Sequence, residues 1–467
     1  MQYVSTRGGV EPVGFSEAVI MGLGTDGGLL LPATLPQIGP NALRDFSRLD
    51  YQDLAVEVMT PFVADAIGRA DLVDLTRRSY ATFPHPEVTP LIRVGEHWIL
   101  ELFHGPTTSF KDVALQFLGN LFEYLLEGDR GRLNILGATS GDTGSAAIAG
   151  VRGKNRIQIF ILHPAGRVSP IQERQMTTVL DANVHNIAIR GTFDDGQHIV
   201  KALFNDLQFK QKYDLGAVNS INWARILAQT VYYFYAWGRV SGGDPRCKLS
   251  FSVPTGNFGD VFAGYMAKRM GLPVDRLLIA TNSNDILTRF VATGVYEAGE
   301  VHPTLSPAMD IQIASNFERY LYYLVGEDAA AVRSLLADMG RVGRMCVTPE
   351  QRLAVGADFD AIAVSDTETL EQIRETYESA GYILDPHTAV GVRAARSRVD
   401  MVCLATAHPA KFDEAVREAI GIGAPPPPSL RGLLEKEARC TLLDADEAAV
   451  REHIRNTLAA MEPYAAL

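Results

Sequence analysis

Short apolar runs alternate with segments of helical period along most of this chain, from residue 133 onward. The strand-like runs cover residues 133–137, 157–162, 184–189, 249–253, 276–280 and 401–405. Segments of helical period stand between them, as at residues 261–270. Apolar runs of this length that alternate with helices predict parallel α/β sheets, whose binding sites lie where the strands end.

Size and composition limit the class of protein. A chain of 467 residues predicts two or three domains, and 47% hydrophobic with 21% charged residues is ordinary for a soluble globular enzyme. The net charge of −12 argues against a nucleic-acid partner, which requires a basic face. The apolar stretches fall short of the roughly 20 residues that span a membrane, so we expect no membrane partner.

The four cysteines form no C-x-x-C pair, which predicts neither a metal site nor a disulfide framework. Free cysteines are typical of a reducing compartment. The first residues show no pattern of a secretory signal, so we expect a cytoplasmic protein. Cys403 lies in an apolar run and is expected to be a small buried hydrophobic residue.

Two regions differ from the alternating pattern. Helical patterns dominate residues 1–92, which we interpret as a mostly helical N-terminal accessory region. Four consecutive prolines at residues 425–428 predict a stiff connector to a C-terminal helical tail, together residues 425–467.

Residues 104–112 have the sequence His-Gly-Pro-Thr-Thr-Ser-Phe-Lys-Asp and follow a strand-like run at residues 98–103. Lys111 thus stands at a strand-to-helix junction, directly after Phe110. Apolar neighbours and a helix N-terminus favour a neutral amine, which can act as a nucleophile or base. The plain alternative is a solvated lysine in a first helical turn. The phosphate cradle described next, and the lack of a rival site, favour the catalytic interpretation.

Residues 253–260, Val-Pro-Thr-Gly-Asn-Phe-Gly-Asp, lie between a strand and a helix. Gly256 and Gly259 are expected to let the backbone turn tightly and expose N–H groups beside the helix N-terminus. Such a turn can hold a phosphate ester, although an ordinary strand-to-helix turn explains the same residues. No lysine follows the second glycine, so the segment is not a Walker A motif.

Two further segments offer polar groups at helix starts. Residues 137–144 carry the hydroxyl groups of Thr139, Ser140 and Thr143, which suit a carboxylate or a second phosphate. Ser140 or Asp142 could instead cap the following helix. Residues 219–225 end in Arg225, which could bind an anion bidentately or lie exposed on an amphipathic helix.

Thr406 follows the strand-like run at residues 401–405, where its hydroxyl can hydrogen-bond a heteroaromatic ring nitrogen. The histidines have no metal-type spacing, and we find no Ser-His-Asp pattern. One lysine, one phosphate cradle and one partner for a ring nitrogen match the needs of pyridoxal 5'-phosphate. We therefore predict this cofactor.

With these motifs in view, the chain resembles the threonine synthase family, in the long form found in bacteria and fungi. The resemblance runs from residues 3–9 and 26–29 through 104–112, 137–144, 219–225 and 256–260 to 406–411. It implies a fold of the tryptophan synthase β type, with two parallel-sheet α/β domains and the cofactor between them. Residues 93–125 with 216–424 would form the large cofactor domain, and residues 126–215 the small one.

The resemblance also implies a lyase that converts O-phospho-L-homoserine and water into L-threonine and phosphate. Lys111 would be the Schiff-base lysine, and Thr406 would face the pyridine nitrogen. The cofactor phosphate would be held by the turn Gly256, Asn257, Phe258, Gly259 and Asp260. A neutral hydroxyl partner at the ring nitrogen does not enforce protonation, which favours elimination and replacement over transamination.

Substrate roles are assigned by chemistry. Candidates for the substrate phosphate are Arg225, Asn222, Ser220 and Thr143, and candidates for its carboxylate are Ser140 and Thr139. Asp142 takes the place where many relatives of this fold carry asparagine, and a carboxylate there would repel a phenolate unless it turned away or was protonated. Alternatives are a threonine or serine dehydratase, which handles no substrate phosphate, and a non-catalytic binding protein. We expect a monomer or weak homo-oligomer.

Overall fold

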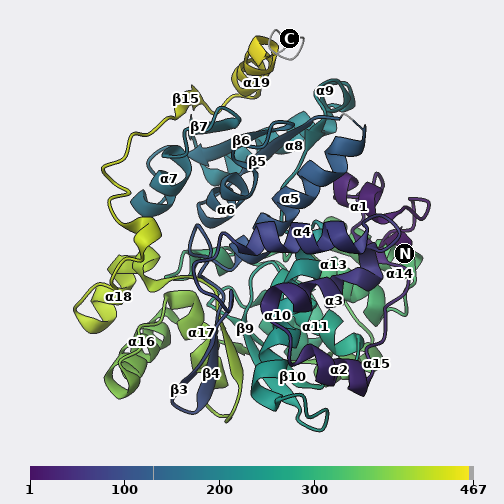
Figure 1. The fold of residues 1–467 in the computed structure, drawn as a ribbon, viewed down its shortest axis with the longest axis vertical. Helices are drawn as coiled ribbons and strands as arrows, with labels where there is room; N and C mark the ends of the chain where they lie inside the picture. The colour runs from purple at the N-terminus through teal and green to yellow at the C-terminus, as the bar shows by residue number, and fades with distance from the viewer. Residues whose placement is uncertain (130, 462–467) are drawn as a thin grey trace. The chain divides into compact units, whose positions relative to one another are not determined.

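The computed structural model describes residues 1–129 and 131–461, which form two compact units (Figure 1). The large unit comprises Met1–Phe117 and Ser220–Pro426. The small unit comprises Leu118–Asn219 and the chain from Pro427 onward. The predicted domain boundaries at residues 92, 125, 216 and 424 remain predictions.

A six-stranded sheet forms the centre of the large unit. Its order is β13(Phe359–Ala363), β10(Val274–Thr281), β9(Leu249–Pro254), β14(Val402–Ala405), β4(His97–Glu101) and β3(Leu91–Val94). Neighbouring strands are parallel except β3, which pairs antiparallel with β4 at the edge. The predicted parallel α/β architecture is therefore confirmed. Four of these strands, β4, β9, β10 and β14, correspond to apolar runs predicted from the sequence.

Helices and short strands complete the large unit. The N-terminal region contains β1(Tyr3–Ser5), α1(Phe15–Met21), β2(Leu30–Pro32), α2(Pro40–Phe46), α3(Tyr51–Val63) and α4(Arg69–Tyr80), so it is mostly helical as expected. The remaining elements are α10(Trp223–Ser241), α11(Gly259–Arg269), α12(Ile286–Thr293), β11(Val295–Glu297), η1(Pro307–Met309), α13(Phe317–Leu324), α14(Ala329–Val342), β12(Arg344–Cys346), α15(Pro349–Asp358), α16(Asp366–Ala380), α17(Pro386–Ala395), η2(Pro409–Phe412) and α18(Asp413–Ile420).

The small unit contains a five-stranded parallel sheet. Its order is β15(Thr441–Asp444), β7(Val184–Arg190), β6(Ile157–Pro164), β5(Leu133–Ala138) and β8(Leu215–Gly216). Its helices are α6(Asp142–Val151), α7(Pro170–Thr177), α8(Phe193–Asn205), α9(Leu207–Lys212), η3(Pro428–Leu430) and α19(Glu447–Met461). Helix α5(Lys111–Asp129) begins in the large unit and continues into the small one. The C-terminal tail supplies a strand, β15, which the sequence analysis did not anticipate.

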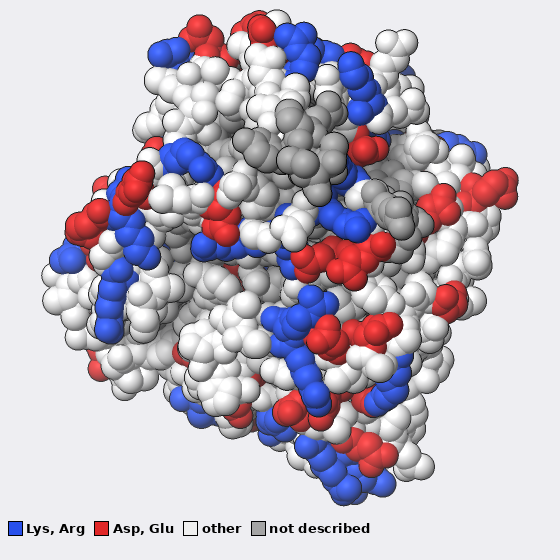
Figure 2. Space-filling view, turned by 45° about the horizontal axis from the view of Figure 1, so that its top comes forward, with Lys and Arg blue, Asp and Glu red and all other residues white. Residues whose placement is uncertain are grey.

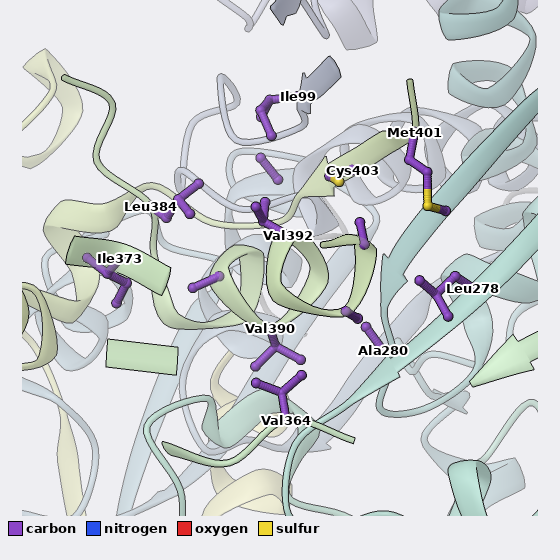
Figure 3. Close-up of a cluster of buried hydrophobic side chains, with 14 of the residues drawn as sticks. Ile99, Leu278, Ala280, Val364, Ile373, Leu384, Val390, Val392, Met401 and Cys403 are labelled. Atoms are coloured by element: carbon purple, nitrogen blue, oxygen red, sulfur yellow. The ribbon is translucent and has the colours of Figure 1, made fainter. Parts of the chain in front are cut away.

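Apolar side chains from α16, α17 and the central strands form one core of the large unit. Cys403 of β14 is fully buried there, as predicted, with Leu278 of β10. Figure 3 shows Val390 of α17 pointing toward Val364, which follows β13. In the small unit, Val450 and Ile454 of α19 are fully buried against the sheet core. The C-terminal helix is therefore an integral part of that unit.

Charged groups of both signs are interspersed on the face shown in Figure 2. Exposed ion pairs such as Arg190–Asp444 and Arg246–Asp244 contribute little to stability, because water screens them. Within the described residues, no helix is both long and apolar enough to cross a membrane.

Candidate functional site

Three adjacent strands of the large sheet bring three of the predicted segments together. β14 pairs in parallel with β4 on one side and with β9 on the other. The carboxyl ends of β4, β9 and β14 lie side by side and lead into residues 104–112, residues 255–258 and Thr406 respectively. The lysine segment, the glycine turn and the threonine therefore meet at one edge of one sheet.

The lysine segment and the Thr406 segment are joined by backbone hydrogen bonds. Phe110 N donates to Thr406 O at 2.8 Å, and His408 N donates to Thr108 O at 3.1 Å. Ser109 and Ala407 form an isolated antiparallel bridge between these bonds. Lys111, the first residue of α5, is 8% exposed, and its Nζ lies 4.8 Å from the centre of the Phe110 ring. The predicted desolvated setting of this lysine is thus present.

A buried ionic cluster shapes the loop before Lys111. Asp112 accepts hydrogen bonds from Thr107 N at 2.8 Å and Thr107 Oγ1 at 2.7 Å. Burial raises the pKa of Asp112 to about 6, against the effect of these bonds and of Lys411. Lys411 Nζ in turn donates to Thr107 O at 2.9 Å. A Cβ on Gly105 would lie 2.3 Å from Asp112 Cβ, so the loop closes tightly on this carboxylate.

The turn after β9 differs in one respect from the prediction, because Phe258 and not a glycine takes the left-handed conformation, with φ 64°. Its ring is 2% exposed and packs against Phe317 and Phe359 at 5.3 and 5.6 Å, which holds the strained backbone. Gly256 instead allows the backbone of Ala308 to approach closely, because a Cβ at residue 256 would lie 2.7 Å from Ala308 O.

The turn leads directly into α11, whose first N–H groups have no acceptor within the helix. Asn316 supports the turn by donating to Asn257 O from both its backbone N and its Nδ2, at 3.0 and 3.1 Å. The same Nδ2 donates to Ser220 O at 3.1 Å. A rigid turn with free N–H groups at a helix N-terminus is suited to a phosphate.

Asp260 directs its carboxylate toward α10. Its Oδ1 accepts from Tyr232 Oη at 2.5 Å and from Tyr233 Oη at 3.0 Å. Burial raises the pKa of Asp260 to about 6, although both tyrosine bonds act in the opposite direction. The side chain of this predicted cofactor residue therefore holds the turn against α10, and its backbone N–H belongs to the helix N-terminus.

Arg225, in the first turn of α10, is 3% exposed. Its Nε and Nη1 are buried and have no hydrogen-bond partner among the described residues. Burial lowers the pKa of Arg225 to about 10, so it remains a cation at neutral pH. The alternative of an exposed arginine on an amphipathic helix is wrong. The neighbouring Ile226 would lie 3.7 Å from a Cβ on Gly259, so this helix turn adjoins the glycine turn.

Two other polar residues near α10 already have partners. Asn222 caps the helix by accepting from Ala224 N at 3.0 Å, and its Nδ2 donates to Val19 O at 2.9 Å. Ser220 Oγ pairs with Ser315 Oγ at 2.8 Å. The buried Arg319 donates to Ile221 O at 2.6 Å and joins this segment to the N-terminal region. Arg319 and Asn316 were not predicted from the sequence, because their partners are distant in the chain.

The remaining predicted residues lie in the small unit, at the start of α6. Thr139 Oγ1 accepts from Gly141 N and Gly144 N, both at 3.0 Å, so Thr139 caps this turn. The expectation that Ser140 or Asp142 caps the helix is wrong, because Gly141 holds the cap position and Asp142 Oδ1 accepts from Gln172 Nε2 at 2.7 Å.

The other hydroxyl groups of this turn differ in their exposure: Ser140 is exposed and Thr143 is partly buried. Within the described part of the chain, no group of three His, Cys, Asp or Glu side chains could hold a metal ion.

Comparison with known proteins matches most of the chain. Family models described as threonine synthase N terminus, pyridoxal-phosphate dependent enzyme and threonine synthase C-terminal match residues 2–80, 82–346 and 388–454. The threonine synthase of Pseudomonas aeruginosa is 50% identical, covering 97% of this chain and 98% of its own. That of Saccharomyces cerevisiae is also 50% identical, with 90% and 89% covered.

A solved structure extends the match to three dimensions. The pyridoxal-phosphate-bound threonine synthase from Brucella melitensis is 47% identical and superimposes with a TM-score of 0.95. The match covers 98% of this chain and 99% of that one.

Proposed function

The chain belongs to the threonine synthase family of pyridoxal-phosphate-dependent enzymes, and on this premise we propose that it converts O-phospho-L-homoserine and water into L-threonine and phosphate. The observation that carries the proposal is the pairing of the lysine segment with Thr406, beside the glycine turn. Nearby, Arg225 supplies a buried cation for an anionic substrate group.

The side chains of the large unit fit the cofactor. The turn 256–260 leads into α11, whose first N–H groups have no acceptor within the helix, so this turn can hold a phosphate. Lys111 would hold the cofactor aldehyde through Nζ, the turn 256–260 would hold its phosphate, and Thr406 would face its ring nitrogen. When bound, the cofactor supplies an electron sink for charge developed on the substrate carbon skeleton.

Lys111 is the residue to which we assign the proton transfers. As a base, its Nζ would take protons from substrate Cα and then from Cβ; as an acid, it would return one proton to Cγ, which becomes the methyl group, and one to Cα. The buried ion cluster of Asp112 and Lys411 keeps the loop before it fixed, so the amine stays directed at one place. The Thr406 hydroxyl is neutral and does not force protonation of its partner nitrogen.

Anion binding is assigned to the remaining residues. We assign the leaving phosphate to Arg225, because an unsatisfied buried guanidinium gains most from a dianion. Ser220 and Thr143 are further phosphate candidates, and Ser140 with Thr139 are candidates for the substrate carboxylate. For Asn222 we propose a positioning role, since both ends of its amide have partners at the start of α10.

Product analysis tests the proposal. Incubation with O-phospho-L-homoserine should release L-threonine and inorganic phosphate in equal amounts, and Lys111→Ala should abolish both. Lys248→Ala is the matched control, because Lys248 is exposed in the same unit. Formation of an oxoacid and ammonia from threonine or serine, without threonine synthesis, would support the dehydratase alternative. We place the enzyme in the cytoplasm, as a monomer or weak homo-oligomer, which sedimentation can measure.

A further inference from the structure

Asp385 directly precedes α17, and its side chain is fully buried. Its two carboxylate oxygens serve different neighbours. Oδ1 accepts from His387 N at 3.0 Å and from His387 Nδ1 at 2.9 Å. Oδ2 accepts from Thr388 N at 3.2 Å and, more closely, from Thr388 Oγ1. A helix cap needs only the backbone bonds, so the bonds to the ring and the hydroxyl need another explanation.

The hydrogen bond to His387 connects Asp385 to the backbone beside the glycine turn. Because Nδ1 donates to Asp385, Nε2 is left as an acceptor, and it accepts from Ala308 N at 3.2 Å. The same residue, Ala308, presents its carbonyl oxygen 2.7 Å from where a Cβ on Gly256 would stand. The imidazole ring, 3% exposed, also packs edge-on against Phe412 at 4.8 Å. Asp385 thereby fixes the backbone that covers Gly256.

The hydrogen bond to Thr388 connects Asp385 to Thr406, which we place at the ring nitrogen of the cofactor. Thr388 Oγ1 donates to Asp385 and accepts from Thr406 N at 3.3 Å. Thr406 O in turn accepts from Phe110 N at 2.8 Å, one residue before Lys111. The Thr388 hydroxyl therefore acts as both donor and acceptor, and an apolar residue of the same shape could form neither bond.

We propose that Asp385 is a positioning residue that aligns both ends of the cofactor site from one carboxylate. Through His387 and Ala308 it sets the glycine turn, and through Thr388 it sets the backbone of Thr406. The inference rests on the proposed function, since it assumes that the turn holds the cofactor phosphate and that Thr406 faces the ring. A single buried carboxylate thus couples the glycine turn to Thr406.

Two conservative substitutions test the connections through His387 and through Thr388 separately. His387→Phe keeps a ring and removes the acceptor for Ala308 N, and it should weaken pyridoxal phosphate binding about tenfold while the visible absorption band of the bound cofactor stays in place. Thr388→Val keeps the shape and removes the hydroxyl, and it should shift that band because Thr406 is no longer held. Asp385→Asn should show both changes.

Thr369→Val is the matched control for loss of a buried hydroxyl. Thr369 is 1% exposed in α16, and its Oγ1 donates to the carbonyl oxygen of Ser365, the N-cap residue of that helix. The control should bind the cofactor with wild-type affinity and absorption. Melting temperatures of all cofactor-free proteins show whether a variant is merely unfolded. If Asp385→Asn does not fold, the His387→Phe and Thr388→Val variants decide the question.

The outcomes separate the two proposals. Wild-type protein that binds no pyridoxal phosphate would end the proposed function. Wild-type protein that binds it, with His387→Phe and Thr388→Val variants that match Thr369→Val in affinity and absorption, would end the positioning role of Asp385. Phosphorus NMR of the bound cofactor adds an independent readout: His387→Phe should move its phosphate signal, and Thr388→Val should leave it unchanged.

Discussion

Replacing Gly256 with alanine would place a methyl group 2.7 Å from Ala308 O and 3.1 Å from Met309 Cα. Both neighbours are backbone atoms of η1, so neither can move as a flexible side chain would. Ordinary contact begins near 3.4 Å, so the carbonyl must recede by about 0.7 Å. That movement also strains the bond from Ala308 N to His387 Nε2 at 3.2 Å.

Overpacking of this kind costs about 1–3 kcal/mol. If the turn holds the cofactor phosphate, this cost falls on the conformation that binds it, and Gly256→Ala should weaken pyridoxal phosphate binding roughly 5- to 150-fold. Equilibrium dialysis of the cofactor-free protein against pyridoxal phosphate measures the change directly. Reconstituted samples then show whether turnover at saturating cofactor recovers.

Two other glycines provide a graded comparison. A Cβ on Gly259 would meet Asn316 Nδ2 at 3.2 Å, which is a milder contact with a side chain. We expect Gly259→Ala to cost less than about fivefold in cofactor affinity. Gly340, exposed in α14, has nothing within 4 Å of an added Cβ, and Gly340→Ala should stabilise the helix by about 0.5–1 kcal/mol without altering cofactor binding. Equal affinities of the Gly256→Ala and Gly340→Ala proteins would refute the reasoning.

Three further predictions concern charged residues of the site. Lys111→Ala should lower threonine formation by at least about a thousandfold while the protein remains folded, and wild-type turnover in that variant would contradict the role of the amine. Arg225→Ala should lower kcat/KM for O-phospho-L-homoserine by about 10- to 100-fold with the cofactor absorption retained. Loss of the cofactor in that variant would instead place Arg225 at the cofactor phosphate. Asp260 should make the cofactor-free protein less stable as pH rises, because burial raises its pKa from 3.8 to about 6 and the native state therefore favours its protonated form. This contribution is present below about pH 3.8 and is lost as pH rises through about 6, so Asp260→Asn should gain up to about 3 kcal/mol relative to wild type between pH 4 and pH 7 in urea unfolding. A difference between the two proteins that does not change with pH would contradict the burial of this charge.

The sequence predicted those elements whose signal is local. The runs at residues 133–137, 157–162 and 249–253 were correctly predicted as strands, because parallel strands buried on both faces have continuous apolar sequences. β15 was missed because an edge strand is apolar on one face only, and its four residues alternate between partly buried and exposed positions. The meeting of Lys111, Thr406 and the glycine turn followed from the rule that sites lie at the carboxyl ends of parallel strands.

The environment of a side chain could not be predicted from the sequence where its contacts come from residues distant in the chain. Nothing in residues 219–225 distinguishes a buried Arg225 from an exposed one, because burial is decided by the elements that cover α10. Phe258 was not recognised as the left-handed residue, since its strain is held by Phe317 and Phe359. The bond between Ala308 and His387 joins residues 79 apart, so the role of Asp385 emerged only in the folded chain.

The pairing of β15 with β7 has a consequence for biosynthesis. β7 ends at Arg190, and its open edge meets Thr441–Asp444 some 250 residues later. Until the ribosome has passed Ile454, the nascent sheet exposes unpaired N–H and C=O groups and the surface that Val450 and Ile454 finally cover. A premature stop codon after the large unit would therefore release a polypeptide prone to aggregate, and co-translational chaperones have a defined target in the edge of β7.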